Sequence, residues 1–264
     1  MNLKKIALDT ANIAKDVGAF IRAARKDVKK EDIEHKEKNS LVSFVDKEAE
    51  KRIVARLAEL LPEATFITEE STVQNQVSEL EWIVDPLDGT TNYLHNLPIY
   101  AVSIALRHQG DIVVGVIYMP ETDEVYYAWQ DGGAWLNGQQ IHTSSNTDFK
   151  EALIGLGKPY KYESLNMHQM VLVRLLKETR GIRRMGAAAV DLAYTASGRL
   201  DAYFEYNLHI WDIAAGILLV KEAGGNVSGF MGSDGYKKGN QVVAGSPHVH
   251  SKLLDIIMPK SLVF

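Results

Sequence analysis

The sequence predicts a layered α/β fold with two β-sheets and helices packed against them. Three observations predict it: short apolar runs typical of buried strands, longer runs with helical spacing of apolar residues, and a change of pattern at about residue 145. Strands dominate before that point, and strands alternate with helices after it. Because no linker marks the change, we expect two halves, 1–145 and 146–264, that share one site.

The first half is expected to begin with two helices. Apolar residues over 3–21 recur near helical spacing, and a second helix over 43–61 begins at a capping box of Ser43 and Asp46. The lysine-rich segment 26–39 between them is predicted to be a loop or short edge strands. The strands expected next are 65–68, 82–84, 100–106, 111–119 and 124–129.

In the second half, strands and helices alternate. The expected strands are 152–155, 200–206 and 241–244. The expected helices are 165–178, 188–196, 211–223 and a last one after residue 244. Ser197-Gly198 and Gly224-Gly225 are typical of helix C-termini, since glycine adopts the left-handed conformation at little cost.

Composition excludes several classes of protein. The 264 residues are 46% hydrophobic and 24% charged, as in soluble globular chains. There is no cysteine, which excludes a disulfide scaffold, a thiolate zinc site, a catalytic thiol and an iron–sulfur cluster. The net charge of −5 argues against nucleic acid as the main partner. No apolar run approaches the roughly 18 residues that cross a bilayer, so we expect no membrane partner and a cytoplasmic location.

The most informative stretch runs from Asp85 to Asn92 and reads Asp-Pro-Leu-Asp-Gly-Thr-Thr-Asn. Two carboxylates fixed close together suit a hard cation such as Mg²⁺, and the backbone N–H groups that follow can face an anion. The alternative is an Asx turn, which prefers the same residue types. Two residues separate Asp85 from Asp88, and a turn can wrap both around a metal. This spacing favours metal-activated water over a covalent aspartate.

Three other acidic positions are candidates. Glu69 and Glu70 follow the strand 65–68, where sites of α/β proteins collect, with an exposed charged loop as the alternative. Asp212 begins an apolar helix whose next residues are small, and an N-cap is the alternative. Asp46 has its own alternative as the partner of the Ser43 cap.

Together these segments resemble the inositol monophosphatase family, within the superfamily of Mg²⁺-dependent, Li⁺-sensitive phosphatases. Asp85–Asn92 matches the first family signature, Trp211–Gly216 the second, and Phe66–Ser71 the segment of a strand followed by glutamates. The resemblance covers roughly residues 3–258. It implies an αβαβα sandwich, a homodimer, a small phosphorylated substrate and two or three Mg²⁺ ions.

The resemblance also implies roles for particular residues. The implied metal ligands are the carboxylates of Glu69, Asp85, Asp88 and Asp212 and the main-chain carbonyl of Leu87. The residues implied to orient the attacking water are Glu69, Thr90 and Asp46. The residues implied to bind phosphate and substrate are Gly89, Thr90, Thr91, Gly186, Ala188, Glu205 and Asp212.

Two departures from the family pattern argue against strict inositol specificity. Gly186-Ala187-Ala188 lacks the hydroxyl of the family's Gly-Thr-Ala, and the loop 157–162 brings Lys158 and Lys161 where substrates enter. The predicted function is a Mg²⁺-dependent phosphomonoester hydrolase acting on myo-inositol monophosphate or a related small phosphate. Fructose 1,6-bisphosphate and the 2′-phosphate of NADP are alternative substrates. A regulatory or RNA-associated binding protein on the same fold is the alternative of a different class.

Overall fold

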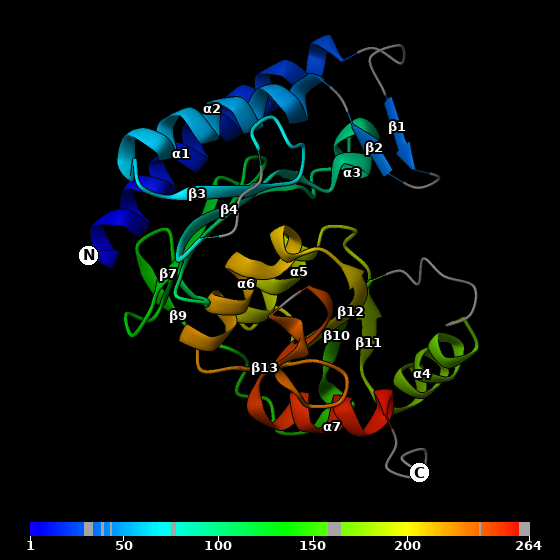
Figure 1. Cartoon of the computed structure of the whole chain (residues 1–264). Coiled ribbons are helices and arrows are strands. Elements are labelled where there is room, and N and C mark those ends of the chain that lie inside the picture. Colours follow the sequence, from blue (N-terminus) through cyan, green and yellow to red (C-terminus); the bar gives the residue numbers. More distant parts are fainter. Residues whose placement is uncertain are drawn as a thin grey trace.

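The computed structural model describes residues 1–28, 34–37, 40–42, 44–74, 78–157, 165–237 and 239–258 (Figure 1). Ser43, expected to cap the second helix, and Lys158 and Lys161, expected near the substrate, lie outside the described residues. Within the described ranges, no helix combines the length and the apolar character that a bilayer span requires.

A seven-stranded sheet forms the centre of the first half. Its strands, in spatial order, are β3 (Thr65–Thr68), β4 (Leu80–Asp88), β5 (Ala101–His108), β6 (Asp111–Met119), β7 (Glu124–Trp129), β8 (Ala134–Leu136) and β9 (Gln139–Ile141). β3 and β4 pair in parallel, and every later pair is antiparallel. The strands predicted at 100–106, 111–119 and 124–129 are therefore confirmed, and they belong to one continuous antiparallel meander.

Both faces of this sheet are covered by helices. Trp82 and Val84 of β4 pack with α1 (Leu3–Ala24) and α2 (Phe44–Leu60). Ile83, between them in sequence, packs on the other face with α5 (Ala188–Ala196) and α6 (Ile210–Glu222). Successive side chains of a strand point to opposite faces, so a sheet buried on both sides is apolar at every position. This explains the unbroken apolar run that predicted β4.

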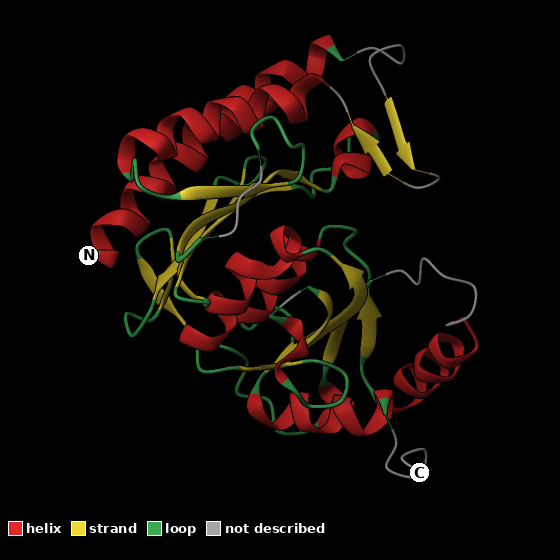
Figure 2. Cartoon of the chain, viewed as in Figure 1, coloured by secondary structure: helices red, strands yellow, loops and turns green. Residues whose placement is uncertain are grey.

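A five-stranded sheet forms the second half. Its strands, in spatial order, are β11 (Gly181–Arg183), β10 (Leu153–Leu156), β12 (Ala202–Leu208), β14 (Asn240–Gly245) and β13 (Asn226–Ser228). Tyr203 packs toward α5 and α6, whereas Phe204 packs toward α4 (Leu165–Glu178) and α7 (Pro247–Ile257). The layers are thus helix, sheet, helix, sheet and helix, which confirms the αβαβα sandwich (Figure 2).

Small residues set the spacing of the central helical layer. A Cβ atom on Gly115 of β6 would lie 2.7 Å from the carbonyl oxygen of Ala215, and one on Gly216 would lie 2.5 Å from the Leu192 side chain. Larger side chains at these positions would push α6 away from β6 and from α5. The small residues that follow Asp212 therefore hold α6 close to both neighbours.

Several elements differ from the predictions. β11 and β13 were not predicted, because three-residue edge strands carry too few positions to show a period. The segment 26–39, in contrast, contains the short strand β1 (Glu34–Glu37), which pairs with β2 (Ser40–Val42) and agrees with the prediction of a loop or short edge strands. Asp85 to Asp88 is not a free turn as expected, since β4 continues through Asp88 before the short helix α3 (Thr90–Leu94).

Candidate active site

β4 carries two acidic residues into the site through an irregular strand end. Asp85 lies opposite Ser103 of β5, whereas Asp88 lies opposite Ala101, so β4 has one residue more than β5 over this interval. An extra residue of this kind is a β-bulge, and it reverses the alternation of side chains along the strand. Pro86 is tolerated here because a bulge interrupts the ladder. The bulge thus lets Asp85 and Asp88 face the same side, which a regular strand would prevent.

The Asx turn that the sequence left as an alternative is also present. Oδ1 of Asp85 accepts a hydrogen bond from the backbone N–H of Leu87 at 2.9 Å. This bond fixes the Asp85 carboxylate and turns the main chain so that the Leu87 carbonyl faces Thr90. The turn and a ligand role are compatible, because a carboxylate has a second oxygen.

Thr90 joins the end of β4 to α2. Its Oγ1 lies 3.0 Å from Oδ1 of Asp46 and 3.0 Å from the Leu87 carbonyl oxygen. Asp46 is 1% exposed and lies in the first turn of α2. Gly89, at φ 92°, makes the left-handed step that a side chain would resist, and it places Thr90 and Thr91 in the first turn of α3. The structure therefore brings Asp46, Leu87 and Thr90 together.

The second half approaches the same strand end through α5. Oδ2 of Asp88 accepts a hydrogen bond from the backbone N–H of Ala189 at 2.6 Å. Ala187, the N-cap residue of α5, makes no side-chain cap, so Asp88 takes that role from the other half of the chain. Asn92 adds a second link, since its Nδ2 donates to the Met185 carbonyl at 2.8 Å. Gly186 and Ala188 are thereby held beside Asp88.

Asp212 lies at the first turn of α6. Its Oδ2 accepts a hydrogen bond from the backbone N–H of His209 at 2.7 Å, which satisfies one donor at the helix start. The N-cap residue of α6 is His209, so Asp212 is not the N-cap that was the alternative; it caps the helix start from the third helical position, through one carboxylate oxygen. The imidazole of His209 stacks on the Trp211 indole with ring centroids 4.5 Å apart. This stack fixes the chain next to Asp212.

Glu69 and Glu70 are held by a residue that the sequence reasoning missed. Glu50 of α2 is fully buried, and its carboxylate accepts hydrogen bonds of 2.7 Å from the backbone N–H groups of Glu70 and Thr72. Glu69 itself donates its N–H to the Val84 carbonyl at 3.2 Å. The segment is thus an anchored part of the site and not the exposed charged loop that was the alternative. Glu50 follows Asp46 by four residues on the buried face of α2, and that spacing is the signal that could have found it.

The acidic residues are close enough to repel one another. Burial raises the pKa of Asp85 well above its ordinary value, and repulsion from Glu69, Asp88 and Asp212 raises it further. Burial raises the pKa of Asp88 to about 7, although the backbone N–H of Ala189 opposes this. Burial and then repulsion from Asp88 raise the pKa of Asp212. Glu69, which follows β3, therefore shares one electrostatic environment with the acidic residues of β4 and α6.

Glu205 of β12 faces the same environment. It contributes to the raised pKa of Asp88 and Asp212 through repulsion, after burial in each case. The Tyr203 hydroxyl donates a hydrogen bond to Oε2 of Glu205. The carboxylate also lies against the main chain of Gly157, where a Cβ atom would be 1.7 Å from the Glu205 Cδ. The position of Glu205 thus depends on the absence of a side chain at residue 157.

The donor set fits a hard divalent cation. Carboxylate and carbonyl oxygens are the ligands that Mg²⁺ prefers, and Asp85, Asp88, Asp212 and the Leu87 carbonyl supply them. Their mutual repulsion is what a cation would relieve. Within the described ranges, no three histidine, cysteine or acidic side chains are arranged so that they alone could hold a metal ion. A cation here would therefore also use the main-chain carbonyl or water.

Asp191 of α5 is a second buried acid that sequence reasoning missed. It is 1% exposed, and its Oδ1 has no hydrogen-bond partner among the described residues. Burial raises its pKa well above the ordinary value, repulsion from Glu205 and Asp88 adds to this, and Arg184 opposes it. In the sequence Asp191 lies within an apolar helix, and nothing there distinguishes it from a polar position on a helix surface.

Replacing Asp191 with asparagine is expected to stabilise the protein at neutral pH. Above about pH 4 the unfolded chain releases a proton that the folded protein retains, so the free energy of unfolding falls as the pH rises. Asparagine removes this dependence, and the gain in stability should grow with pH. Urea denaturation at several pH values measures it, with Asp255→Asn on the exposed face of α7 as the control. A gain that is equal at every pH would contradict the assignment.

Comparison with known proteins gives a consistent result. A sequence model described as the inositol monophosphatase family matches residues 3–260. An inositol-1-monophosphatase of Mesorhizobium japonicum is 43% identical over 218 residues, 82% of each chain. The Nus factor SuhB of Escherichia coli K12 is 42% identical over 218 residues, also 82% of each. A crystal structure of the extragenic suppressor protein SuhB from Bartonella henselae superposes with a TM-score of 0.92 at 38% identity, covering 97% of this chain and 99% of that one.

Proposed function

Because the chain belongs to the inositol monophosphatase family, we propose that it is a Mg²⁺-dependent phosphatase of myo-inositol monophosphate or a related small phosphate. The proposal includes two or three Mg²⁺ ions and a homodimer in the cytoplasm, as the resemblance implies. The observation that carries it is the shared environment of Asp85, Asp88 and Asp212, which come from both halves of the chain. If the three carboxylates served only in their local turn and helix caps, they would have no reason to lie close to one another.

Hydrolysis of a phosphate monoester depends mainly on positioning and charge. Bound Mg²⁺ supplies positive charge at the phosphoryl oxygens and the leaving alkoxide, and it makes water a better nucleophile. The ligands proposed for it are Glu69, Asp85, Asp88, Asp212 and the Leu87 carbonyl. Gly89, Thr90 and Thr91 directly follow the proposed ligand Asp88 in the chain, which supports their role in holding the phosphate.

Thr90 is suited to orient the attacking water. A threonine hydroxyl has one proton and two lone pairs, and here the proton is directed to Asp46 or to the Leu87 carbonyl. Its lone pairs are then available to accept a hydrogen bond from water. Glu69 contributes to the raised pKa of Asp85 and so lies near it, which supports a role for Glu69 in taking the proton that the water loses. Asp46 acts through Thr90 and is a positioning residue.

The substrate ring is proposed to contact Glu205, Gly186 and Ala188. Each carboxylate oxygen has two lone pairs, so a carboxylate that accepts the Tyr203 hydroxyl can also accept a sugar hydroxyl. The short residues at 186 and 188 leave room for the ring, and Asn92 holds their segment beside the phosphate end of the site.

Phosphate release from a panel of esters tests the proposal. Myo-inositol 1-phosphate, fructose 1,6-bisphosphate and NADP are compared side by side, with Mg²⁺ in the millimolar range and with a chelator. We expect release from inositol phosphate in Mg²⁺, loss of activity on chelation and recovery when Mg²⁺ is restored. Mg²⁺ should also raise the unfolding temperature, because an ion that binds only the folded protein stabilises it. Folded protein that releases phosphate from none of the esters would contradict the proposal.

Gly157→Ala tests the part of the proposal that concerns Glu205. The added methyl would occupy the place of the carboxylate, so Glu205 must turn away. We expect kcat/KM for inositol phosphate to fall by about tenfold, about 1.4 kcal/mol, mainly through KM. Gly181→Ala is the matched control, because a Cβ there meets its nearest atom at an ordinary 3.6 Å in the same sheet. An unchanged KM in Gly157→Ala would remove Glu205 from the substrate site.

A second candidate function is favoured by the relatives themselves. The Escherichia coli relative at 42% identity is a Nus factor, so a role as a Nus factor, with or without catalysis, is a proposal for this chain also. It corresponds to the regulatory alternative that the sequence left open. Failure of phosphate release from every ester, with the fold intact, would favour it.

A further inference from the structure

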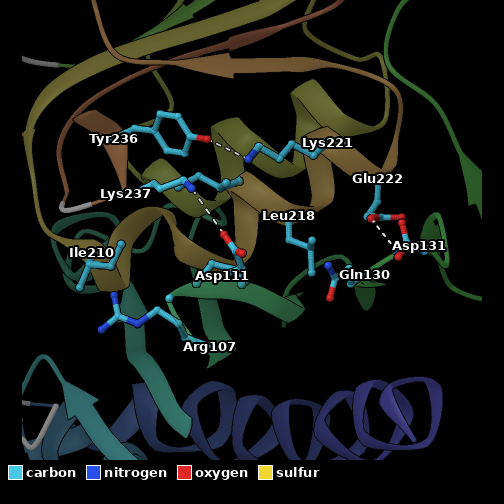
Figure 3. A pocket seen from close by; sticks show the side chains of 13 residues that line it. Arg107, Asp111, Gln130, Asp131, Ile210, Leu218, Lys221, Glu222, Tyr236 and Lys237 are labelled. Carbon is cyan, nitrogen blue, oxygen red and sulfur yellow. Dashed lines mark hydrogen bonds and ion pairs between the residues drawn. The ribbon is translucent and has the colours of Figure 1, made fainter. Parts of the chain in front are cut away.

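A cavity of about 330 Å³ opens between α6, the hairpin of β5 and β6, and the short 3-10 helix Asp234–Tyr236 (Figure 3). None of the active-site residues named above is among those that line it. Its volume lies at the lower end of the range of about 300 to 1,000 Å³ that is usual for small-molecule sites. The cavity is therefore a separate candidate site.

One wall of the cavity is apolar. Ile112 of β6 and Ile217 and Leu218 of α6 contribute to it. Most of the other lining residues are polar or charged, so these side chains form the apolar part of a mixed lining. The apolar wall therefore suits the hydrocarbon part of a ligand.

Two of the charged groups at the cavity have structural partners. Arg107 is paired with Glu81, which is 1% exposed, and its Nε donates to Oε2 of that carboxylate at 2.6 Å. Glu222 accepts hydrogen bonds from the backbone N–H groups of Asp131 and Gly133 at 2.9 and 2.8 Å. Neither group can turn to a ligand without breaking these contacts.

Lys221 differs from them because its partner is neutral. Its Nζ donates to the Tyr236 hydroxyl at 2.8 Å and lies 5.1 Å from the centre of that ring. Within the described ranges, no carboxylate forms an ion pair with it. A phenol that accepts from an ammonium group still has its own proton to donate. Lys221 and Tyr236 therefore offer a positive charge and a hydroxyl donor at one end of the cavity.

A second lysine adds to this end. Nζ of Lys237 lies 3.4 Å from Oδ1 of Asp111, and the two side chains are 46% and 68% exposed. Exposed pairs of this kind contribute little, so the Lys237 charge can be shared with a ligand. Figure 3 shows Asp131 beside Glu222, whereas Tyr236 lies on the other side of Lys221. Asp131 and Glu222 thus lie away from the phenol, whereas Asp111 lies next to Lys237 and shares its charge.

We propose that this cavity binds a small organic anion. Lys221 and Tyr236 hold its carboxylate or phosphate group, and its apolar body rests on Ile112, Ile217 and Leu218. A ligand with a charged group and an apolar body matches both the Lys221–Tyr236 end and the apolar wall of the cavity. A fully polar anion would leave the apolar wall exposed to water.

Naphthoate is a suitable probe, with naphthalene methanol as its uncharged counterpart. Binding to the full chain is followed by the shifts of backbone amide signals in NMR, without added divalent ion and without any substrate. We expect saturable binding of naphthoate, with shifts at the residues that line the cavity, and much weaker binding of the alcohol. Because no turnover is measured, the result is independent of the proposed phosphatase activity.

Lys221→Met should weaken naphthoate binding by at least about tenfold, and Tyr236→Phe should weaken it less. Lys252→Met, which removes an exposed lysine of α7, is the matched control and should bind as the unaltered protein does. The proposal is overturned by absence of saturable binding, by equal binding in Lys221→Met and Lys252→Met, or by equal binding of the alcohol. Shifts centred on Asp85 and Thr90 instead of the cavity would also overturn it.

Discussion

Replacing Asp85 with asparagine is expected to lower phosphate release in Mg²⁺ by at least about 10³-fold, roughly 4 kcal/mol of transition-state stabilisation. Asparagine has nearly the same shape, and its Oδ1 can still accept the hydrogen bond from the Leu87 N–H. It lacks the charge that a cation ligand supplies. Initial rates at saturating Mg²⁺ and inositol phosphate measure the effect.

The folded state of this variant should be retained. The Asp85 carboxylate is buried among repelling charges, so an uncharged amide relieves a cost that the folded protein bears. Urea denaturation is expected to show stability equal to or above that of the unaltered protein. Asp111→Asn, at a side chain that is 68% exposed, makes the same chemical change on the surface and should keep full activity. A rate for Asp85→Asn within about tenfold of the unaltered protein would exclude Asp85 from the site.

Glu50→Ala is expected to lower both stability and activity. The change leaves the N–H groups of Glu70 and Thr72 without their acceptor, at a cost of about 1–3 kcal/mol each. We therefore expect a loss of about 3 kcal/mol in the free energy of unfolding. Glu69 directly precedes the released segment, so kcat/KM should also fall by at least about tenfold.

Glu48→Ala provides the control on the same helix. Its carboxylate is 41% exposed and, among the described residues, pairs with Arg52 of the next turn alone, which predicts a change within about 0.5 kcal/mol. Glu50→Gln keeps one acceptor oxygen and should lie between the two in stability. If Glu50→Ala loses stability but keeps full kcat/KM, then Glu50 supports the fold alone and does not position Glu69.

The acidic residues at the end of β4 could be predicted because the residues that identify them are adjacent in the sequence. Asp85, Asp88 and the hydroxyl residues after them stand together in eight residues, and the three residues before them, 82–84, are all apolar. The layered fold followed from the same apolar periodicity in strands and helices. The resemblance to a family then joined Asp212 and Glu205 to Asp85, although more than 100 residues separate them in the chain.

What the sequence did not predict depends on contacts between distant segments. The hydrogen bonds of Glu50 reach across 20 and 22 residues, and the link from Asp88 to Ala189 spans 101. The bulge in β4 arises from pairing with β5, and no local pattern distinguishes it from a turn. Asp191 resembles a surface residue until the layers around α5 are known. Such features require the tertiary structure, because propensity concerns neighbours in the chain alone.

The bond from Asp88 to the start of α5 would make the affinity of the proposed cation site sensitive to the position of the central helices. One oxygen of that carboxylate is held by Ala189, so a slight slide of α5 along the sheet would rotate the other. Enlarging Gly216, which packs on Leu192 of α5, would cause such a slide from inside the core. A larger residue at position 216, which does not contact the proposed substrate, would then raise the Mg²⁺ concentration needed for activity before it had any other effect on the reaction.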